Sequence, residues 1–287
     1  MHGFLNIDKP AGMTSHDVVA RVRRLAGQKR VGHAGTLDPA ATGVLVVALG
    51  AATRLIEYVQ DETTKGYRAV VRLGQTTATD DAEGEPLETR PLPPLDSVAI
   101  EAALAPFRGA IQQVPPMYSA LHHQGQRLYD LARAGVTLDL PARTVTIERL
   151  DLVSWQPPDL TLDVLCGKGT YIRSLARDLG AALGCGGHLA ALRRTRVGAF
   201  TVEESVPLDG LDPAAALLPI ELAVADWPAA HLDADQARRV RNGLPLELPG
   251  LPGPRARAHA PDGTLLALLH RRDDGTWQPN KVLAIET

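Results

Sequence analysis

The sequence predicts a mixed α and β protein, with one large domain and a small β-rich module at the C-terminal end. The chain has 287 residues, which is enough for such a pair. Its 45% hydrophobic and 22% charged residues are ordinary for a globular protein and exclude a disordered chain. Patterns typical of helices and of strands alternate along the chain, and a stretch rich in Pro, Ala and Asp interrupts them late. We therefore expect a large domain over residues 1–210, a linker over 211–230 and the small module over 231–287.

The first expected elements are a strand, a helix and a second, buried strand. Residues 3–7 have a strand pattern that ends at a run of turn residues. Thr14 with Asp17 three positions later is typical of a helix start, where the two side chains cap the backbone. Apolar residues at helical spacing follow, and Gly27 suits the end of that helix. The continuous apolar run over 44–49 predicts a strand buried on both faces.

The middle of the chain begins with an alternating strand pattern over residues 66–73. Residues 75–105 are acidic, with seven Asp or Glu against one Arg. We expect an exposed loop in the first part of this segment and a helix over 96–107. A second helix is predicted over 121–134.

Two strands and a helix complete the large domain. Strand patterns over 145–155 and 160–166 are joined by a Pro-Pro turn. A helix over 172–183 follows, and Gly184 ends it. In the small module we expect a short helix and then strands over 256–259, 265–269 and 282–285.

The distribution of charge is uneven although the formal net charge is only −3. Between residues 9 and 36 there are six Lys or Arg and one acid, and between residues 165 and 198 the same ratio recurs. Such clusters suit the phosphate backbone of a nucleic acid, because each neutralised phosphate releases counterions. Each cluster is equally consistent with a solvated helix face. Two clusters balanced by an acidic segment elsewhere favour a nucleic-acid partner that meets one face of the protein.

Other features of the sequence argue for a reduced, cytoplasmic protein. Cys166 and Cys185 are too few for a disulfide framework and match no zinc signature. Residues 1–10 carry charges and a proline where a signal peptide needs an apolar core. No stretch approaches the ~20 apolar residues of a membrane span. We expect no membrane association.

The most informative segment is the glycine-rich loop over residues 32–43. Its three glycines allow a close approach of the backbone to a ligand. Asp38 lies between a leucine and a proline, which stiffens the backbone at the aspartate. A carboxylate on a rigid loop beside a buried strand suits a nucleophile or a general base. Spacing alone favours an Asx turn, in which Asp38 only accepts bonds from nearby amides. His33 lies near, but no third ligand accompanies the pair, so we expect no metal.

The loop also resembles the catalytic motif of the TruB family of tRNA pseudouridine synthases, and four further motifs of that family occur in order. One motif would be suggestive, whereas five in order are highly specific. The likeness covers nearly the whole chain. The matching segments are residues 3–16, 32–45, 65–68 with 72–75, 116–121 with 125, 128–129 and 132–133, and 168–176 with 192–194.

The resemblance implies a reaction and three catalytic residues. The family isomerises uridine 55 in the T loop of tRNA, after the target base is flipped out. Asp38 matches the catalytic aspartate, and Arg173 matches the arginine that pairs with it and favours its ionised form. Tyr67 matches the aromatic that stacks on the target base. Attack of the carboxylate at C1′, addition at C6 and a glycal intermediate all remain open.

The resemblance also implies residues that bind the RNA. His33 would fill the space left by the flipped base, Leu192 would line the uracil pocket, and Tyr118 would lie in the cleft. Asp81 matches an acid that helps hold RNA and neighbouring loops. Two local departures, at Ala78 and His122, put RNA contacts in doubt but not the chemistry. Candidate phosphate contacts are Lys9, Arg54, Lys168, Arg193 and Arg194.

The fold and partners follow from the same resemblance. It implies an α+β catalytic domain with a mainly antiparallel sheet and a central cleft. The small module resembles a PUA-like RNA-binding domain only through residues 239–243 and the strands after them. The isomerisation is redox-neutral, so no cofactor is expected. We expect tRNA as the partner of a monomer, with no obligate protein partner.

Two other classes of function are consistent with parts of the sequence. Basic clusters with base-flipping residues fit an RNA folding helper in which isomerisation is dispensable. Refolding of misfolded tRNA by an Asp38→Asn variant distinguishes that class from an enzyme. Residues 167–170 suggest a phosphate-binding transferase, but they lack the spacing of a P-loop.

Overall fold

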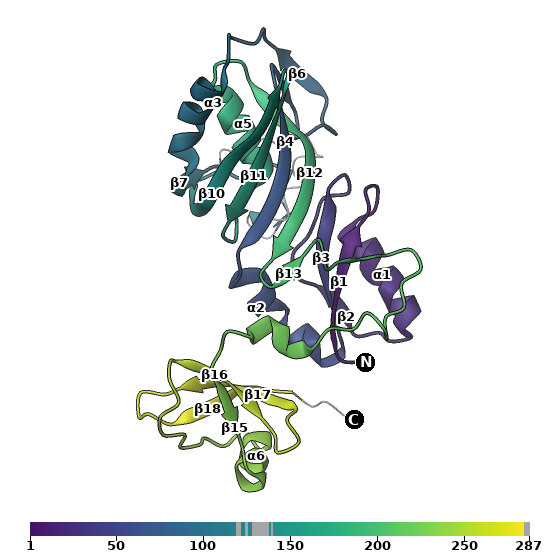
Figure 1. Ribbon diagram of the computed structural model, residues 1–287, viewed down its shortest axis with the longest axis vertical. Helices are drawn as coiled ribbons and strands as arrows, with labels where there is room; N and C mark the ends of the chain where they lie inside the picture. The colour runs from purple at the N-terminus through teal and green to yellow at the C-terminus, as the bar shows by residue number, and fades with distance from the viewer. Residues whose placement is uncertain (119–121, 124–125, 128–137, 139, 284–287) are drawn as a thin grey trace.

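The computed structural model describes residues 1–118, 122–123, 126–127, 138 and 140–283. A ten-stranded sheet forms the body of the molecule, in the order β14-β1-β3-β12-β4-β11-β10-β7, with β2 beside β3 and β13 beside β12 (Figure 1). Only β1–β14 and β3–β12 pair in parallel. Its strands are β1 (Gly3–Lys9), β2 (Val31–His33), β3 (Thr42–Leu49), β4 (Lys65–Leu73), β7 (Gly109–Gln113), β10 (Arg143–Gln156), β11 (Asp159–Cys166), β12 (Gly187–Val197), β13 (Phe200–Thr201) and β14 (Val206–Pro207).

Helices cover this sheet at both ends, and a second sheet forms the C-terminal module. The α+β class and the mainly antiparallel sheet that the sequence predicts are confirmed. The helices are α1 (Ser15–Ala26), α2 (Ile56–Asp61), α3 (Ser97–Leu104), α5 (Ile172–Ala182) and α6 (Ala234–Arg241), with short 3₁₀ helices η1 (Gly50–Leu55), η2 (Ala105–Phe107) and η3 (Ile220–Val224). The second sheet has the order β15 (Ala229–His231), β16 (Arg255–His259), β17 (Leu265–Arg271) and β18 (Trp277–Val282).

Helix α1 confirms the prediction made from its capping residues. The Thr14 side chain accepts a bond from the Asp17 amide, and the Asp17 carboxylate accepts one from the Thr14 amide. Gly27 ends the helix in the left-handed conformation at φ 60°. The predicted strands β1, β3, β4, β10 and β11 and the predicted helices α3 and α5 are also confirmed.

The central strand β12 is not among the predicted strands. Two irregularities interrupt its pairing with β4, between Leu189 and Ala191 and between Arg194 and Arg196. Each irregularity reverses which side chains face the core, so no regular alternation of apolar and polar residues develops along the strand.

Three further expectations differ from the structure. The segment expected as an exposed loop forms a hairpin of β5 (Gln75–Thr77) and β6 (Pro86–Thr89). The helix expected over 121–134 is wrong at the four residues that pair as β8 (His122–His123) and β9 (Gln126–Arg127), and the rest of it lies outside the described residues. The last strand of the module begins earlier than expected, at Trp277.

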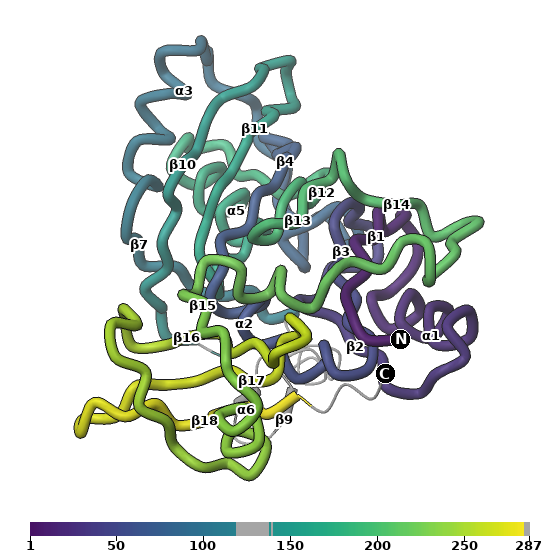
Figure 2. Tube along the Cα trace, turned by 60° about the horizontal axis from the view of Figure 1, so that its bottom comes forward, coloured from purple at the N-terminus to yellow at the C-terminus, as the bar shows by residue number. Residues whose placement is uncertain are grey.

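The segment over 211–230 packs against the large domain. Leu211 belongs to the apolar core beneath α1, and Ile220 and Val224 belong to the core beneath α2. Leu265 and Leu268 of the module join that second core, so α2 and η3 lie between the two sheets (Figure 2). The domain boundaries at 210 and 231 remain predictions. No helix of the described residues is both long and apolar enough to cross a bilayer.

Gly43 is required where β3 and β12 meet. Its φ is +97°, and an added Cβ would lie 2.2 Å from the carbonyl oxygen of Arg194. We expect Gly43→Ala to lower the free energy of unfolding by about 3 kcal/mol, from the disfavoured conformation and the backbone clash together. Gly27→Ala is the matched control, because Gly27 also has positive φ but its Cβ would meet nothing within 4 Å. That control should cost about 1 kcal/mol in urea denaturation, and equal costs for the two variants would contradict the clash.

Candidate active site

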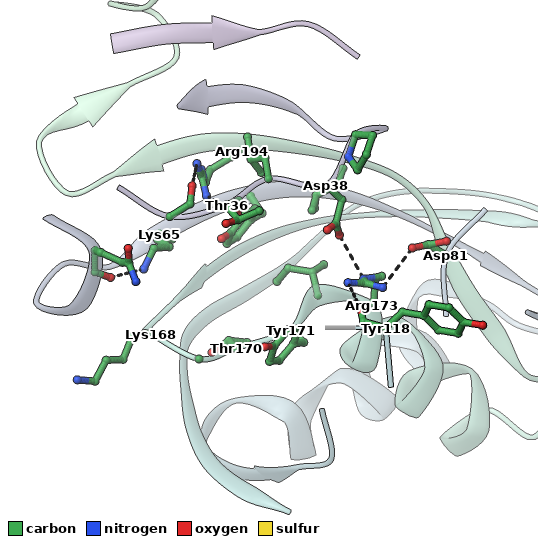
Figure 3. Close-up of a pocket in the computed structure, with 18 of the residues that line it drawn as sticks. Thr36, Asp38, Lys65, Asp81, Tyr118, Lys168, Thr170, Tyr171, Arg173 and Arg194 are labelled. Carbon is green, nitrogen blue, oxygen red and sulfur yellow. Dashed lines mark hydrogen bonds and ion pairs between the residues drawn. The ribbon is translucent and has the colours of Figure 1, made fainter. Parts of the chain in front are cut away.

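A cavity of about 740 Å³ opens where the two halves of the large sheet meet (Figure 3). Its walls come from the loop after β2, the start of β4, the β5–β6 hairpin, the N-terminal end of α5 and β12. The parts of the chain that supply them are far apart in sequence. The lining residues are 35–39, 60, 61, 65, 67, 79, 81, 83, 118, 167–173, 192 and 194.

Two buried side chains hold the backbone on either side of Asp38. Ser15 Oγ donates to the Leu37 carbonyl at 3.1 Å and accepts a bond from the Leu37 amide at 2.9 Å. Lys9 Nζ donates to three carbonyls, of which Pro39 O lies at 3.1 Å. Burial lowers the pKa of Lys9, and the nearby Asp38 charge opposes that shift. The loop is therefore fixed immediately before and immediately after its aspartate, as a site for pre-organised chemistry requires.

Arg194 of β12 holds the start of the same loop. Its guanidinium donates to Gly35 O at 3.0 Å and to Thr36 O at 3.3 Å, and it also reaches Val44 O at 2.7 Å in β3. The side chain is 1% exposed. All of these acceptors are backbone carbonyls, so Arg194 acts on the shape of the loop.

Arg173 connects the loop to the opposite wall of the cavity (Figure 3). Its Nε lies 3.3 Å from Asp38 Oδ2, and its Nη1 lies 3.4 Å from Asp81 Oδ2. Nη2 donates to Tyr118 O at 2.8 Å. The Arg173 side chain is 10% exposed, whereas that of Asp38 is 44% exposed. The carboxylate is thus open to the cavity while a nearly buried cation orients it.

The position of Arg173 depends on how α5 begins. The amide of Tyr171 donates to Gln113 Oε1 at 2.8 Å, and Gln113 Nε2 donates back to Tyr171 O at 3.1 Å. Ser174 Oγ donates to Val114 O at 2.8 Å. These bonds join the first turn of α5 to the end of β7, and they make up for the missing side-chain cap of that helix.

The β5–β6 hairpin is fixed to α5 by a second ion pair. Arg177 Nη1 lies 2.9 Å from Asp80 Oδ2. Asp80 has φ +60°, and burial raises its pKa although Arg177 opposes the shift. Thr79 Oγ1 donates to Asp81 Oδ1, which orients the acid that faces Arg173. The hairpin thereby places Asp81 in the cavity wall.

Tyr67 lines the cavity and is 9% exposed. Burial raises its pKa, and the adjacent Arg194 charge opposes that shift. Its hydroxyl therefore stays protonated to a higher pH than that of a tyrosine in water. The ring can form an apolar wall against a planar ligand.

The structure brings most of the predicted site residues to one cavity. Eight of the twelve line it: Asp38, Tyr67, Asp81, Tyr118, Lys168, Arg173, Leu192 and Arg194. Arg194 lies beneath the loop, and Lys168 lies at the far end and extends away from Asp38 (Figure 3).

The remaining predicted residues lie elsewhere. His33 stands half-buried in edge-to-face contact with His16, with ring centroids 5.4 Å apart, outside the lining that the described residues form. Arg54 donates to Val282 O of the C-terminal module. Arg193 lies 2.8 Å from Asp8, beside the loop.

The structure contradicts two of the predicted phosphate contacts. Lys9 is 0% exposed and Arg194 is 1% exposed. Their donors bond to backbone carbonyls in and beside the loop, so neither side chain is available to a phosphate. Positive charge in the sequence does not reveal whether a side chain points to water or beneath a loop.

Four supporting residues were not predicted from the sequence: Ser15, Lys65, Thr79 and Gln113. Lys65 lines the cavity, donates to Gln60 O at 2.6 Å, and has a pKa that burial lowers. Ser15 and Lys65 lie within segments that match the family motifs, and this match is the sequence feature that could have identified them. The part of the chain that the structure describes contains no group of three His, Cys, Asp or Glu that can hold a metal ion.

Comparisons with known proteins agree on one family. A family model for the N-terminal domain of TruB family pseudouridylate synthases matches residues 23–172. A model for the C-terminal domain of tRNA pseudouridylate synthase B matches residues 173–224, and a model for the C-terminal part of tRNA pseudouridine synthase II matches residues 227–284.

Relatives and solved structures extend this likeness over almost the whole chain. The tRNA pseudouridine synthase B of Thermobifida fusca (strain YX) is 53% identical, and the match covers 98% of each chain. That of Gloeobacter violaceus (strain ATCC 29082 / PCC 7421) is 50% identical over 83% of this chain and 84% of its own. A chain in the crystal structure of a Cbf5-Nop10-Gar1 complex has a TM-score of 0.75 at 27% identity, covering 98% of this chain and 84% of that one. The chain belongs to the TruB family of tRNA pseudouridine synthases.

Proposed function

We propose that the protein converts uridine 55 in the T loop of tRNA to pseudouridine, with Asp38 as the nucleophile. The observation that supports this most directly is the exposed Asp38 carboxylate held 3.3 Å from the nearly buried Arg173 guanidinium in the cavity wall. An ionised carboxylate on a rigid loop is the group that the reaction needs on one face of the nucleoside.

The reaction breaks the C1′–N1 bond, turns the freed uracil and joins C1′ to C5. The C5 proton leaves and N1 gains a proton, so the overall change is an isomerisation. Asp38 attacks or assists departure of the base, while Arg173 holds the carboxylate in its orientation. Leu192 and the Tyr67 ring flank the uracil while it turns.

The target base must leave the T loop before it reaches the cavity. Extruding a base from a stack costs a few kcal/mol, which contacts elsewhere have to offset. His33 offsets part of this cost by filling the space that the base leaves. Tyr118, Lys168 and Arg193 offset the rest by contacting the surrounding RNA. The protein acts as a cytoplasmic monomer on tRNA.

Tyr67→Phe tests whether the hydroxyl moves a proton. Because burial raises the pKa of Tyr67, the neutral phenol is the form present through neutral and mildly alkaline pH. If the hydroxyl donates or relays a proton, Phe should lower the single-turnover rate about 10²-fold or more while tRNA affinity stays unchanged. Rates are to be compared from pH 6 to pH 9 by release of tritium from C5-labelled tRNA. A wild-type rate in Tyr67→Phe would restrict Tyr67 to stacking.

The function itself is tested by mapping the modified position. Unmodified tRNA is incubated with the purified protein, and pseudouridine is located at single-nucleotide resolution. We expect conversion at position 55 alone, and none in a matched tRNA that carries cytidine there. Conversion at another uridine would contradict the proposed specificity, and absence of any conversion would contradict the proposed activity.

A further inference from the structure

Arg194 is a buried cation that donates to three backbone carbonyls and also forms a side-chain hydrogen bond with Tyr67. It contacts Val44 O at 2.7 Å, Gly35 O at 3.0 Å and Thr36 O at 3.3 Å. Among the residues that the structure describes, no carboxylate forms an ion pair with it. Burying a charge without an opposite charge is unfavourable unless hydrogen bonds compensate for the lost hydration, as the bonds to these three carbonyls do. The need for a guanidinium at this position therefore lies in what it contacts.

The backbone of Arg194 joins the two halves of the large sheet. In the register of the strands it stands opposite Gly43 of β3 on one side and Tyr67 of β4 on the other. The contact with Gly43 is so close that no Cβ fits between the chains. Arg194 thus lies between the loop that carries Asp38 and the strand that carries Tyr67.

The side chain of Arg194 determines the path of the loop toward Asp38. Gly35 has φ +94°, and the carbonyls of Gly35 and Thr36 both point to the guanidinium. These carbonyls lie two and three residues before the aspartate. A guanidinium presents several donors in one rigid plane, which suits simultaneous bonds to diverging carbonyls, whereas a lysine ammonium is a single point.

We propose that Arg194 is a positioning residue for the isomerisation, which sets the placement of the Asp38 loop relative to the Tyr67 ring. This inference rests on the proposed function, in which Asp38 reacts with a nucleoside that stacks on Tyr67. A nucleophile displaced by about 1 Å loses on the order of 10²-fold in rate. Arg194 acts through the loop and does not touch the substrate.

Two variants test this role. Arg194→Lys keeps the charge but cannot bridge the three carbonyls, and Arg194→Met removes the charge and keeps the length. We expect each to lower the single-turnover rate at saturating tRNA by about 10²-fold. The dissociation constant for tRNA should stay within about threefold, because the side chain is buried beneath the loop. The matched control is Arg72→Lys in β4, whose guanidinium is exposed and pairs with Asp159 at 2.7 Å.

All rates are measured at one temperature, about 20 °C below the lowest melting temperature among the variants. Every variant is then folded during the assay, so lost stability cannot account for a lower rate. A rate loss that disappears under these conditions would mean that Arg194 only stabilises the fold and would overturn the proposal. Loss of tRNA affinity with an unchanged rate would overturn it as well.

Asp38→Asn is measured beside these variants, so that failure of the proposed function can be distinguished from failure of the proposed role of Arg194. If Asp38→Asn turns over like the unsubstituted protein, the proposed function fails. If Asp38→Asn is inactive and both Arg194 variants keep rates within about threefold of the unsubstituted protein, only the role of Arg194 fails.

Discussion

Asp38→Asn should abolish formation of pseudouridine and leave binding of tRNA largely intact. The amide has the shape of the carboxylate but carries no charge and is a poor nucleophile, so we expect the single-turnover rate to fall by about 10⁴-fold or more. The affinity for tRNA should change little. The substitution removes no bond between the protein and the RNA backbone, and the loss of one negative charge only reduces repulsion of the RNA phosphates. The measurement is a single-turnover assay at saturating tRNA together with a filter-binding titration.

The matched control for this variant is Asp61→Asn. Asp61 lies in the same cavity, so its substitution removes one negative charge from the site without altering the Asp38–Arg173 pair. We expect its rate to stay within about threefold of the unsubstituted protein. A rate for Asp38→Asn within tenfold of that control would contradict a nucleophilic role.

Arg173→Lys should have the second largest effect, about 10²- to 10³-fold on the rate. The guanidinium reaches Asp38, Asp81 and the carbonyl of Tyr118 at the same time. A lysine ammonium keeps the charge but cannot satisfy acceptors that lie in three directions. In the lysine variant the carboxylates of Asp38 and Asp81 repel each other more strongly, because no guanidinium lies between them. The melting temperature should therefore fall as well.

Arg177→Lys is the control for Arg173→Lys, since it lies one turn further along α5 and pairs with Asp80 and Asp178. It tests the loss of a guanidinium that orients the hairpin but does not contact Asp38. We expect a rate loss below about tenfold, because its effect on Asp38 is indirect. Equal losses for the two variants would mean that Arg173 contributes only through the hairpin.

Elements with a complete local signal are the ones that the sequence predicts well. The capping pair Thr14 and Asp17 and the left-handed Gly27 specify α1 within a single stretch of chain. The apolar run of β3 is buried on both faces, as its composition requires. The motifs likewise predict that Asp38, Tyr67 and Arg173 belong to one site, and all three line one cavity although Arg173 is far from the other two in the sequence.

Elements that depend on distant partners were not predicted. β12 loses its alternation at two irregularities in its pairing with β4, a strand more than a hundred residues earlier in the chain. Two acids of the β5–β6 hairpin, Asp80 and Asp81, pair with arginines of α5 that lie far along the chain. Composition alone made that segment resemble a solvated loop.

Local patterns are sufficient to predict α1, α3 and α5, the strands β1, β3, β4, β10 and β11, the family motifs and the identity of the acidic and basic groups at the site. Only the tertiary structure decides which of those charges meet substrate. Lys9 and Arg194 resemble phosphate contacts in the sequence, yet both lie beneath the Asp38 loop and donate to its carbonyls. The physical reason is that burial and bond partners depend on segments that fold together from far apart, whereas charge belongs to the residue itself.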